Sequence, residues 1–75
     1  MSEEERWFLR VVDDYEREGH GARSIDITRR EQVEYMLPPS SALRRLWERG
    51  YLRRRPARGG YSYRLTEKGQ KEIGY

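Results

Sequence analysis

The chain has 75 residues, of which 39% are charged and 35% are hydrophobic, and its formal net charge is +3. A chain of this length builds one small domain, so we expect a single domain over residues 1–75 with a thin core. The absence of cysteine excludes disulfides, thiolate metal sites and thiol nucleophiles. No apolar run approaches the roughly 20 residues that a membrane span needs, so we expect a cytoplasmic protein with no membrane partner.

Charge is distributed unevenly along the chain. Residues 1–37 carry six arginines against ten acids, whereas residues 38–75 carry ten basic residues against three acids. The two segments therefore have formal net charges of −4 and +7. An asymmetry of this kind within one small domain indicates a basic face that binds a polyanion.

The first predicted element is a helix over residues 3–18, because large apolar side chains recur at helical spacing and charges fill the positions between them. This apolar set consists of Trp7, Phe8, Val11, Val12 and Tyr15. Gly19 and Gly21 are expected to end the helix, since glycine favours the backbone conformation found after a helix end. Residues 24–27 alternate polar and apolar side chains, which predicts a short strand or extended segment.

Two further helices are predicted next. Thr28 is expected to begin the second helix, because Thr28 and Glu31 have the spacing of a capping box. The buried side of that helix is predicted to consist of Val33, Met36 and Leu37. Pro38 cannot continue the helix, whereas Pro39 suits the first turn of a third helix that runs over residues 40–49.

A β-hairpin and a last short helix complete the predicted order. Gly50 ends the third helix, and residues 51–55 and 61–65 are predicted to pair as strands on either side of a Pro- and Gly-containing turn. Three side chains share one face of the second strand and are expected to cover the core, namely Tyr61, Tyr63 and Leu65. Thr66 is predicted to cap a helix over residues 67–73. This order predicts an α+β fold.

Two motifs in this region resemble those of a known family. Residues 46–52 read LWERGYL, and after a run of arginines residues 65–69 read LTEKG. Together they resemble the pattern L-x-x-x-G-hydrophobic-hydrophobic followed by L-T-x-x-G of winged helix-turn-helix regulators of the MarR and PadR types, and of small archaeal winged-helix proteins, over roughly residues 25–73. The resemblance implies sequence-specific or architectural binding of double-stranded DNA and a role in transcription regulation, with helix 40–49 in the major groove and hairpin 51–65 as the wing. Those regulators usually carry extra helices for dimerisation and effector binding, so we expect no cofactor and no small-molecule ligand here.

The third helix carries the first group of candidate DNA-binding residues. Leu43, Leu46 and Trp47 are spaced to face the core, which leaves two adjacent arginines on the opposite side. Arginine donates twice to guanine or grips a phosphate, and serines near the helix start reach phosphate oxygens. From this helix we therefore predict DNA contacts by Ser40, Ser41, Arg44 and Arg45. The alternative is a solvated face on which the arginines pair with Glu48 at helical spacing.

The hairpin and the second helix supply the remaining candidates. Strand alternation places Arg53 and Arg55 on the side opposite the apolar strand face, and Arg58 lies at the hairpin tip. With no acids beside them these arginines repel one another unless a polyanion is bound, and by resemblance the tip arginine enters the minor groove. Arg29 and Arg30 are expected in the first turn of the second helix, where a helix N-terminus favours phosphate. Their pairing with nearby acids is the alternative.

An enzyme is not expected from this inventory. The chain has one histidine, His20, and its carboxylates are scattered over helix exteriors, so neither a nucleophile–base pair nor a metal cluster is predicted. The predicted partner is double-stranded DNA, with an acidic protein or RNA as alternatives. We also predict a homodimer through the first helix, because its apolar stripe is wide and Leu9 falls on a different side of the helix.

Overall fold

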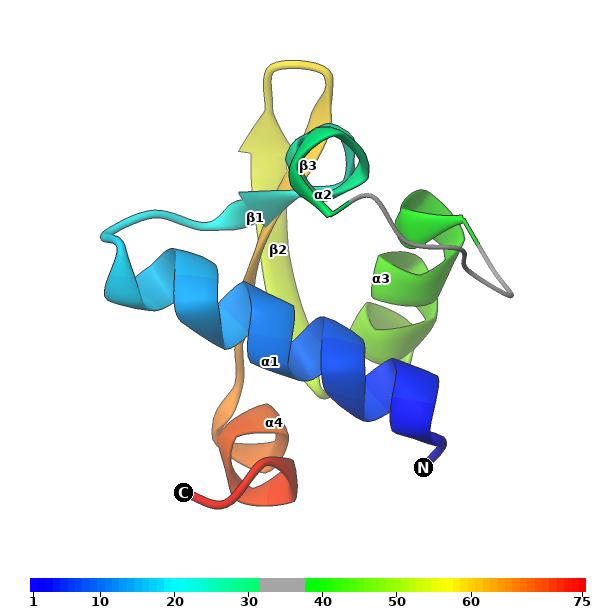
Figure 1. Cartoon of the computed structure of the whole chain (residues 1–75), viewed down its shortest axis with the longest axis vertical. Coiled ribbons are helices and arrows are strands. Elements are labelled where there is room, and N and C mark those ends of the chain that lie inside the picture. The colour runs from blue at the N-terminus through cyan, green and yellow to red at the C-terminus, as the bar shows by residue number, and fades with distance from the viewer. Residues whose placement is uncertain (32–37) are drawn as a thin grey trace.

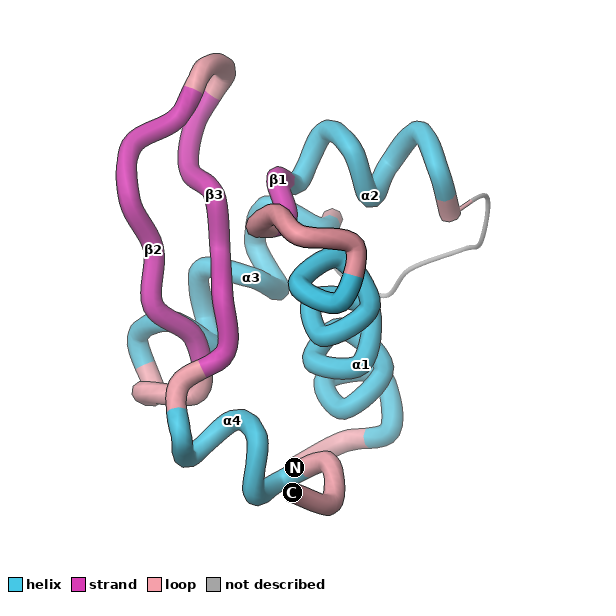
Figure 2. The backbone as a smooth tube through the Cα atoms, turned by 90° about the vertical axis from the view of Figure 1, so that its left-hand side faces the viewer, coloured by secondary structure: helices cyan, strands magenta, loops and turns pink. Residues whose placement is uncertain are grey.

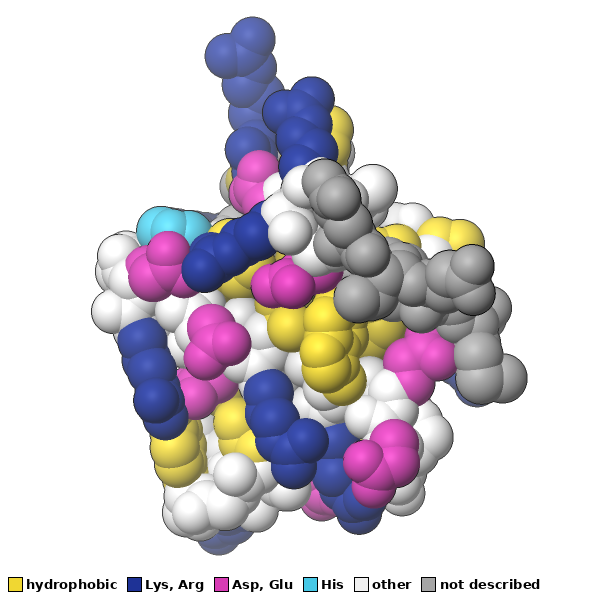
Figure 3. All heavy atoms as spheres, viewed as in Figure 1, with side chains coloured by type: hydrophobic (Ala, Val, Ile, Leu, Met, Phe, Trp, Pro, Cys, Tyr) yellow, Lys and Arg dark blue, Asp and Glu magenta, His cyan; other side chains and the backbone are white. Residues whose placement is uncertain are grey.

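The computed structural model describes residues 1–31 and 38–75. These residues form four helices and a three-stranded antiparallel sheet, which confirms the predicted α+β class (Figure 1). Along the chain the elements are α1 (Glu3–Arg17), β1 (Ala22–Arg23), α2 (Ser24–Arg30), α3 (Pro39–Glu48), β2 (Leu52–Ala57), β3 (Gly60–Leu65) and α4 (Glu67–Glu72). The β2–β3 hairpin lies on one side of the molecule, α1 and α2 lie on the other, and the hairpin tip extends beyond the helices (Figure 2). Basic side chains project at the hairpin end of the molecule (Figure 3).

Helix α1 confirms the first prediction. Ser2 caps it through a capping box, because the Ser2 hydroxyl accepts from the Glu5 backbone N–H and the Glu5 carboxylate accepts from the Ser2 backbone N–H. Gly19, with a φ of 100°, follows the end of the helix as predicted. Leu9, predicted to lie apart from the apolar stripe, is 0% exposed and belongs to the core of its own chain. Leu9 is therefore not available for contact with a second chain, and it no longer supports the predicted homodimer.

The predicted strand at residues 24–27 is wrong. The strand is the preceding pair, Ala22–Arg23, and Ser24 begins α2. Alternation at Ile25 and Ile27 suggested one strand face, but in the helix Ile27 is fully buried and Ile25 is exposed. Because a helix turns by about 100° per residue, two positions two residues apart point in nearly opposite directions. One buried isoleucine was thus enough to produce a misleading strand pattern.

The predicted start of the second helix is also wrong. Thr28 lies inside α2, where its hydroxyl donates to the Ser24 carbonyl over 3.0 Å instead of capping a helix. The helix ends at Arg30, with Glu31 as its C-cap residue, so the Thr28–Glu31 capping box does not form. The predicted buried side of the second helix, Val33, Met36 and Leu37, lies outside the described residues.

The sheet has the order β1-β3-β2, so β2 is an edge strand. The pairing of Leu52 with Leu65 at one end and of Ala57 with Gly60 at the other leaves a two-residue turn, shorter than predicted. Pro56 therefore belongs to the strand rather than the turn. An edge strand tolerates proline where the backbone nitrogen faces solvent, because no neighbouring strand needs an N–H donor there. Gly59, with a φ of 80°, supplies the left-handed backbone that the turn requires.

The core contains side chains from α1, α2, α3 and the sheet. Its largest fully buried side chains come from the first three helices and from β2, and they are Val12, Phe8, Leu9, Ile27, Leu43, Leu46 and Leu52. Tyr63 and Leu65 of β3 cover it as predicted, each 4% exposed, whereas Tyr61 at the end of the same strand face is 41% exposed. The predicted core position of Trp47 is wrong as well, because this side chain lies at the surface.

Contacts between residues 46–52 and 65–69, the two sequence motifs, join the end of α3 to the start of α4. Thr66 caps α4 as predicted, accepting from the Gly69 N–H, while its own hydroxyl donates to the Gly50 carbonyl over 2.6 Å. A Cβ atom at Gly69 would lie 2.2 Å from the Tyr51 carbonyl oxygen, so glycine permits α4 to approach the start of β2. These contacts fix the base of the hairpin. Among the described residues no helix is both long and apolar enough to cross a membrane.

Candidate nucleic-acid interface

Helix α3 presents an exposed side above its buried one. Pro39 occupies its first turn, and Leu43 and Leu46 anchor it in the core. Arg44 points away from that core, and its Nε donates to the Glu48 carboxylate over 2.9 Å. The side chains of Arg44 and Glu48 remain 69% and 51% exposed, so the pair lies in high dielectric and holds Arg44 only weakly. Both predicted features of this helix, an outward arginine and its pairing with Glu48, are therefore present.

Arg45 does not share the surface of Arg44, contrary to the prediction. Neighbouring helix positions differ in direction by about 100°, and this turn carries Arg45 toward the acidic start of α1. Arg45 lines a hollow of about 610 Å³ together with Arg49 and residues of the α1 N-terminus. In the same region Arg49 forms an ion pair with Glu5. Arg45 therefore shares a hollow with Glu3, Glu4 and Glu5, and these acids make it a less favourable contact for a polyanion than Arg44.

A groove runs between α3 and the hairpin. It measures about 440 Å³, and we call its lining the α3 face: Ser24, Ser40, Arg44, Arg54, Gly59, Gly60, Tyr61 and Tyr63. The predicted residues Ser40 and Arg44 both lie in it, while Ser41 is half-buried and does not line it. The turn glycines bring the backbone of the hairpin tip to the same groove. The α3 face thus combines a helix, an arginine and a turn.

Arg54 is a member of this face that sequence reasoning missed. Its guanidinium carbon lies 3.5 Å from the Trp47 ring centroid and 3.8 Å from that of Tyr61, so the cation is stacked between two aromatic rings. This stacking explains why Trp47 and Tyr61 stay at the surface rather than in the core. Strand alternation from Leu52 places Arg54 on the inner side of the hairpin, and this signal was available in the sequence.

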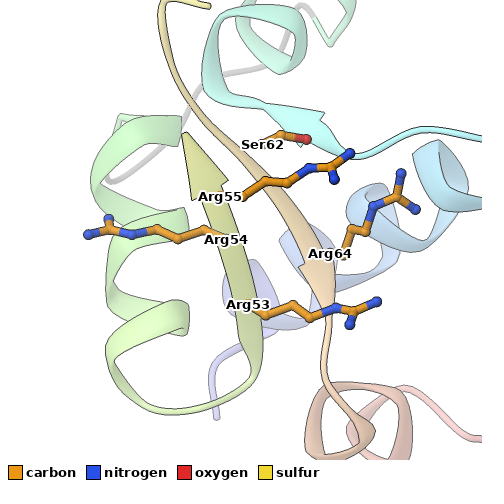
Figure 4. Close-up of a pocket in the computed structure, with 5 residues that line it drawn as sticks. All are labelled: Arg53, Arg54, Arg55, Ser62 and Arg64. Carbon is orange, nitrogen blue, oxygen red and sulfur yellow. The ribbon is translucent and has the colours of Figure 1, made fainter. Parts of the chain in front are cut away.

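The other arginines of the hairpin point the opposite way. Figure 4 shows Arg53 and Arg55 of β2 and Arg64 of β3 projecting from one side of the hairpin, while Arg54 points toward α3. Arg53 and Arg55 are exposed, as predicted, on the side opposite Leu52. We call this side of the sheet the outer face, formed by Arg53, Arg55, Ser62 and Arg64. Contrary to the prediction of one basic surface, the candidate residues lie on two.

Arg58 lies at the tip, where the turn is braced from β1. The Arg23 guanidinium donates to the Arg58 carbonyl over 2.9 Å and also binds the Asp26 carboxylate with two hydrogen bonds of 2.8 and 3.0 Å. This double hydrogen bond from Arg23 is the main reason that the pKa of Asp26 lies below its ordinary value. The side chain of Arg58 itself is exposed. Arg23 therefore positions the tip and leaves the Arg58 guanidinium outward.

Arg29 and Arg30 occupy the last turn of α2, not its first turn as predicted. Their backbone N–H groups are therefore not at a helix N-terminus, and the predicted phosphate site there is wrong. Arg30 binds the Glu18 carboxylate over 2.7 Å and lies 4.9 Å from the Tyr15 ring centroid. The hydrogen bond to Glu18 is the largest reason that the pKa of Arg30 is raised. Arg30 thus stabilises the contact between α1 and α2.

No protein-family model, curated protein or solved structure matches this chain. In the part of the chain that the structure describes, no group of three or more histidine, cysteine, aspartate or glutamate side chains is placed to hold a metal ion. The candidate interface therefore rests on its own geometry and charge.

Proposed function

We propose that this chain is a winged helix-turn-helix domain that binds double-stranded DNA and takes part in transcription regulation. The observation that carries the proposal is the α3 face, where Arg44 of the helix and Gly59 and Gly60 of the hairpin turn line one groove. A helix with an exposed cationic side fits a major groove, which admits one α-helix. A hairpin beside it, projecting past the helices, then reaches the neighbouring groove (Figures 1 and 2).

Two side chains of the α3 face and one at the adjoining hairpin tip would make different contacts with the DNA. Arg44 lies at the centre of the exposed side of α3, where its planar guanidinium is available to donate twice to a guanine edge. Ser40, in the first turn of the same helix, is exposed and close enough to the groove to bind a phosphate oxygen. Arg58 at the tip is suited to a narrow minor groove, whose negative potential attracts arginine.

Electrostatics favour this assignment over a neutral docking surface. Glu48 is the sole acid with an ion pair to α3-face residues among those the structure describes, and its pair with Arg44 is solvent-exposed. Glu3, Glu4 and Glu5 of α1 line a separate hollow with Arg45 and Arg49. A duplex on the α3 face would meet Arg44, Arg54 and Arg58, and it would displace Glu48 from Arg44 at small cost, since exposed pairs contribute little.

The experiment is a mobility-shift titration of the full chain with a random-sequence DNA duplex, an RNA duplex and a polyglutamate competitor. We expect a shift of the DNA duplex at low salt, weaker binding of RNA and little competition by polyglutamate. Arg44→Ala should weaken binding to a selected site, whereas the matched control Arg10→Ala, an exposed arginine of α1 outside both faces, should not. Preference for RNA, or full competition by polyglutamate, would replace the DNA proposal with RNA binding or with docking of an acidic protein.

A further inference from the structure

The outer face carries a charge arrangement that the fold does not need. Arg53 and Arg64 are direct partners across the β2–β3 ladder, and both side chains point to the same side (Figure 4). Like charges placed opposite each other on a sheet destabilise the pairing. Glu16 approaches Arg64 at 4.0 Å, but among the described residues no carboxylate forms an ion pair with Arg53 or Arg55. The ladder therefore places two arginines opposite each other, and among the described residues a carboxylate lies near Arg64 but not near Arg53.

The chemistry of this face suits a phosphate backbone. A hollow of about 340 Å³ lies here, lined by the four outer-face residues together with Arg54, and no apolar residue lines it. Arginine guanidinium and serine hydroxyl groups are common donors to DNA phosphates. A protein partner would need an apolar centre to its interface, whereas protein–DNA interfaces are polar and strongly positive. Charge and composition together favour duplex DNA over a protein.

Position separates this face from the α3 face. Side chains alternate between the two sides of a strand, so Arg54 turns toward α3 while Arg53 and Arg55 turn away from it (Figure 4). Arg53 also pairs near the base of the hairpin, one residue from Leu52 and far along the strand from the tip. Because the two sets of side chains point to opposite sides of the hairpin, we infer that a duplex held by α3 and the tip leaves the outer face accessible.

We propose that the outer face binds a second segment of duplex DNA, so that one molecule bridges two duplexes. This inference rests on the proposed binding of the first duplex by the α3 face. In the bridged state, phosphates of the second duplex neutralise Arg53, Arg55 and Arg64 and remove their mutual repulsion. The segment before β1 packs closely against Ser62, because a Cβ at Gly21 would lie 2.1 Å from the Ser62 Oγ.

The test is a bridging assay with two duplexes of unrelated sequence. One is biotinylated and held on beads, the other is fluorescent, and the measurement is the fluorescence that the full-length protein retains on the beads. The test variant is R53E/R55E, and the matched control is R10E, which reverses an exposed arginine outside both faces. We expect R53E/R55E to reduce capture of the second duplex at least tenfold while its affinity for one duplex in a mobility shift changes less than threefold. R10E should capture like the parent.

A stability measurement separates a binding role from a structural one. R53E places a carboxylate opposite Arg64, so its melting temperature should rise rather than fall while capture is lost. A fall in melting temperature together with lost capture would assign these arginines to the fold and overturn the inference. Capture that persists in R53E/R55E would also overturn it, because a dimer with two α3 faces would then be the bridge. A parent protein that shifts one duplex without capturing a second contradicts bridging alone, whereas a parent that shifts no duplex contradicts the proposed function as well.

Discussion

The arginines before residue 32 and those of the hairpin differ in how many have a carboxylate partner. Before residue 32 four of six arginines have a carboxylate partner, namely Arg6, Arg17, Arg23 and Arg30. In the hairpin, among the described residues, Arg64 alone has one, at 4.0 Å, and Arg53 faces Arg64 across the ladder. Arginine paired with acids joins elements of the fold, whereas arginine left without them is available to a polyanion. The comparison therefore predicts that substitutions in the two regions will separate stability from DNA affinity.

The largest effect is expected in the core that both regions share. Leu46→Ala removes a fully buried side chain from the inner side of α3 and should lower the free energy of unfolding by about 2–5 kcal/mol. Urea denaturation followed by circular dichroism measures the change. A decrease in the free energy of unfolding of less than about 1 kcal/mol would mean that Leu46 does not anchor α3 in the core.

On the outer side of the same helix the expected effect is on binding. Arg44→Ala should cost about 1–3 kcal/mol on a preferred DNA site and should leave binding to random DNA nearly unchanged. Its stability should change by less than about 0.5 kcal/mol, since the pair with Glu48 is exposed. Fluorescence anisotropy titrations of the parent and of Arg44→Ala with the preferred and the random duplex measure both affinities. Equal losses on preferred and random DNA would place Arg44 on the phosphates instead of the bases.

Stability measured as a function of pH tests the contribution of an acid that is paired with an arginine. The pKa of Asp26 is lowered in the folded chain, chiefly by the hydrogen bonds from Arg23, so its contribution is present above the unfolded value near 3.8 and is lost as pH falls through the folded value. The parent should be more stable than Asp26→Asn at pH 6 by up to about 1 kcal/mol, and this difference should shrink toward pH 3. A difference independent of pH would show that the Asp26 charge does not stabilise the hairpin tip.

The smallest effect is predicted for a paired arginine of α2. Arg30→Ala breaks the ion pair with Glu18 and should lower stability by about 0–1 kcal/mol, because both side chains are nearly half exposed. Its DNA affinity should equal that of the parent. A loss of affinity as large as that of Arg58→Ala would remove the distinction between arginines paired with acids and arginines without a carboxylate partner.

Long periodic segments and turn residues were sufficient to predict much of the fold. The stripe of α1, the proline start of α3, the hairpin and the Thr66 cap each combine a pattern with a local signal, and each is confirmed. The region of α2 was mispredicted because Ile25 and Ile27 alternate like a strand. A helix of seven residues with no side-chain cap leaves little local signal, and its position depends on packing against other elements.

The candidate site was predicted by residue type better than by arrangement. Ser40, Arg44, Arg53, Arg55 and Arg58 are exposed where expected, but Arg45 turns toward α1 and the hairpin arginines divide between two faces. Which acids approach which arginine depends on contacts between distant segments, such as Glu18 with Arg30. Periodicity within one element does not contain that information. Arg54 shows the reverse case, because strand alternation from Leu52 indicates its side of the hairpin, but the run of three arginines concealed this signal and Arg54 was missed.

The salt dependence of duplex binding tests most directly the claim that the hairpin arginines bind phosphate. For a short duplex of random sequence, a plot of the logarithm of affinity against the logarithm of salt concentration should have a slope of about −2 or steeper, because Arg54 and Arg58 each replace counterions at a phosphate. Arg58→Ala should make that slope shallower by about one, while Arg10→Ala should leave it unchanged. An affinity that stays flat from low to physiological salt, or a slope that Arg58→Ala does not alter, would contradict the assignment of the hairpin to DNA.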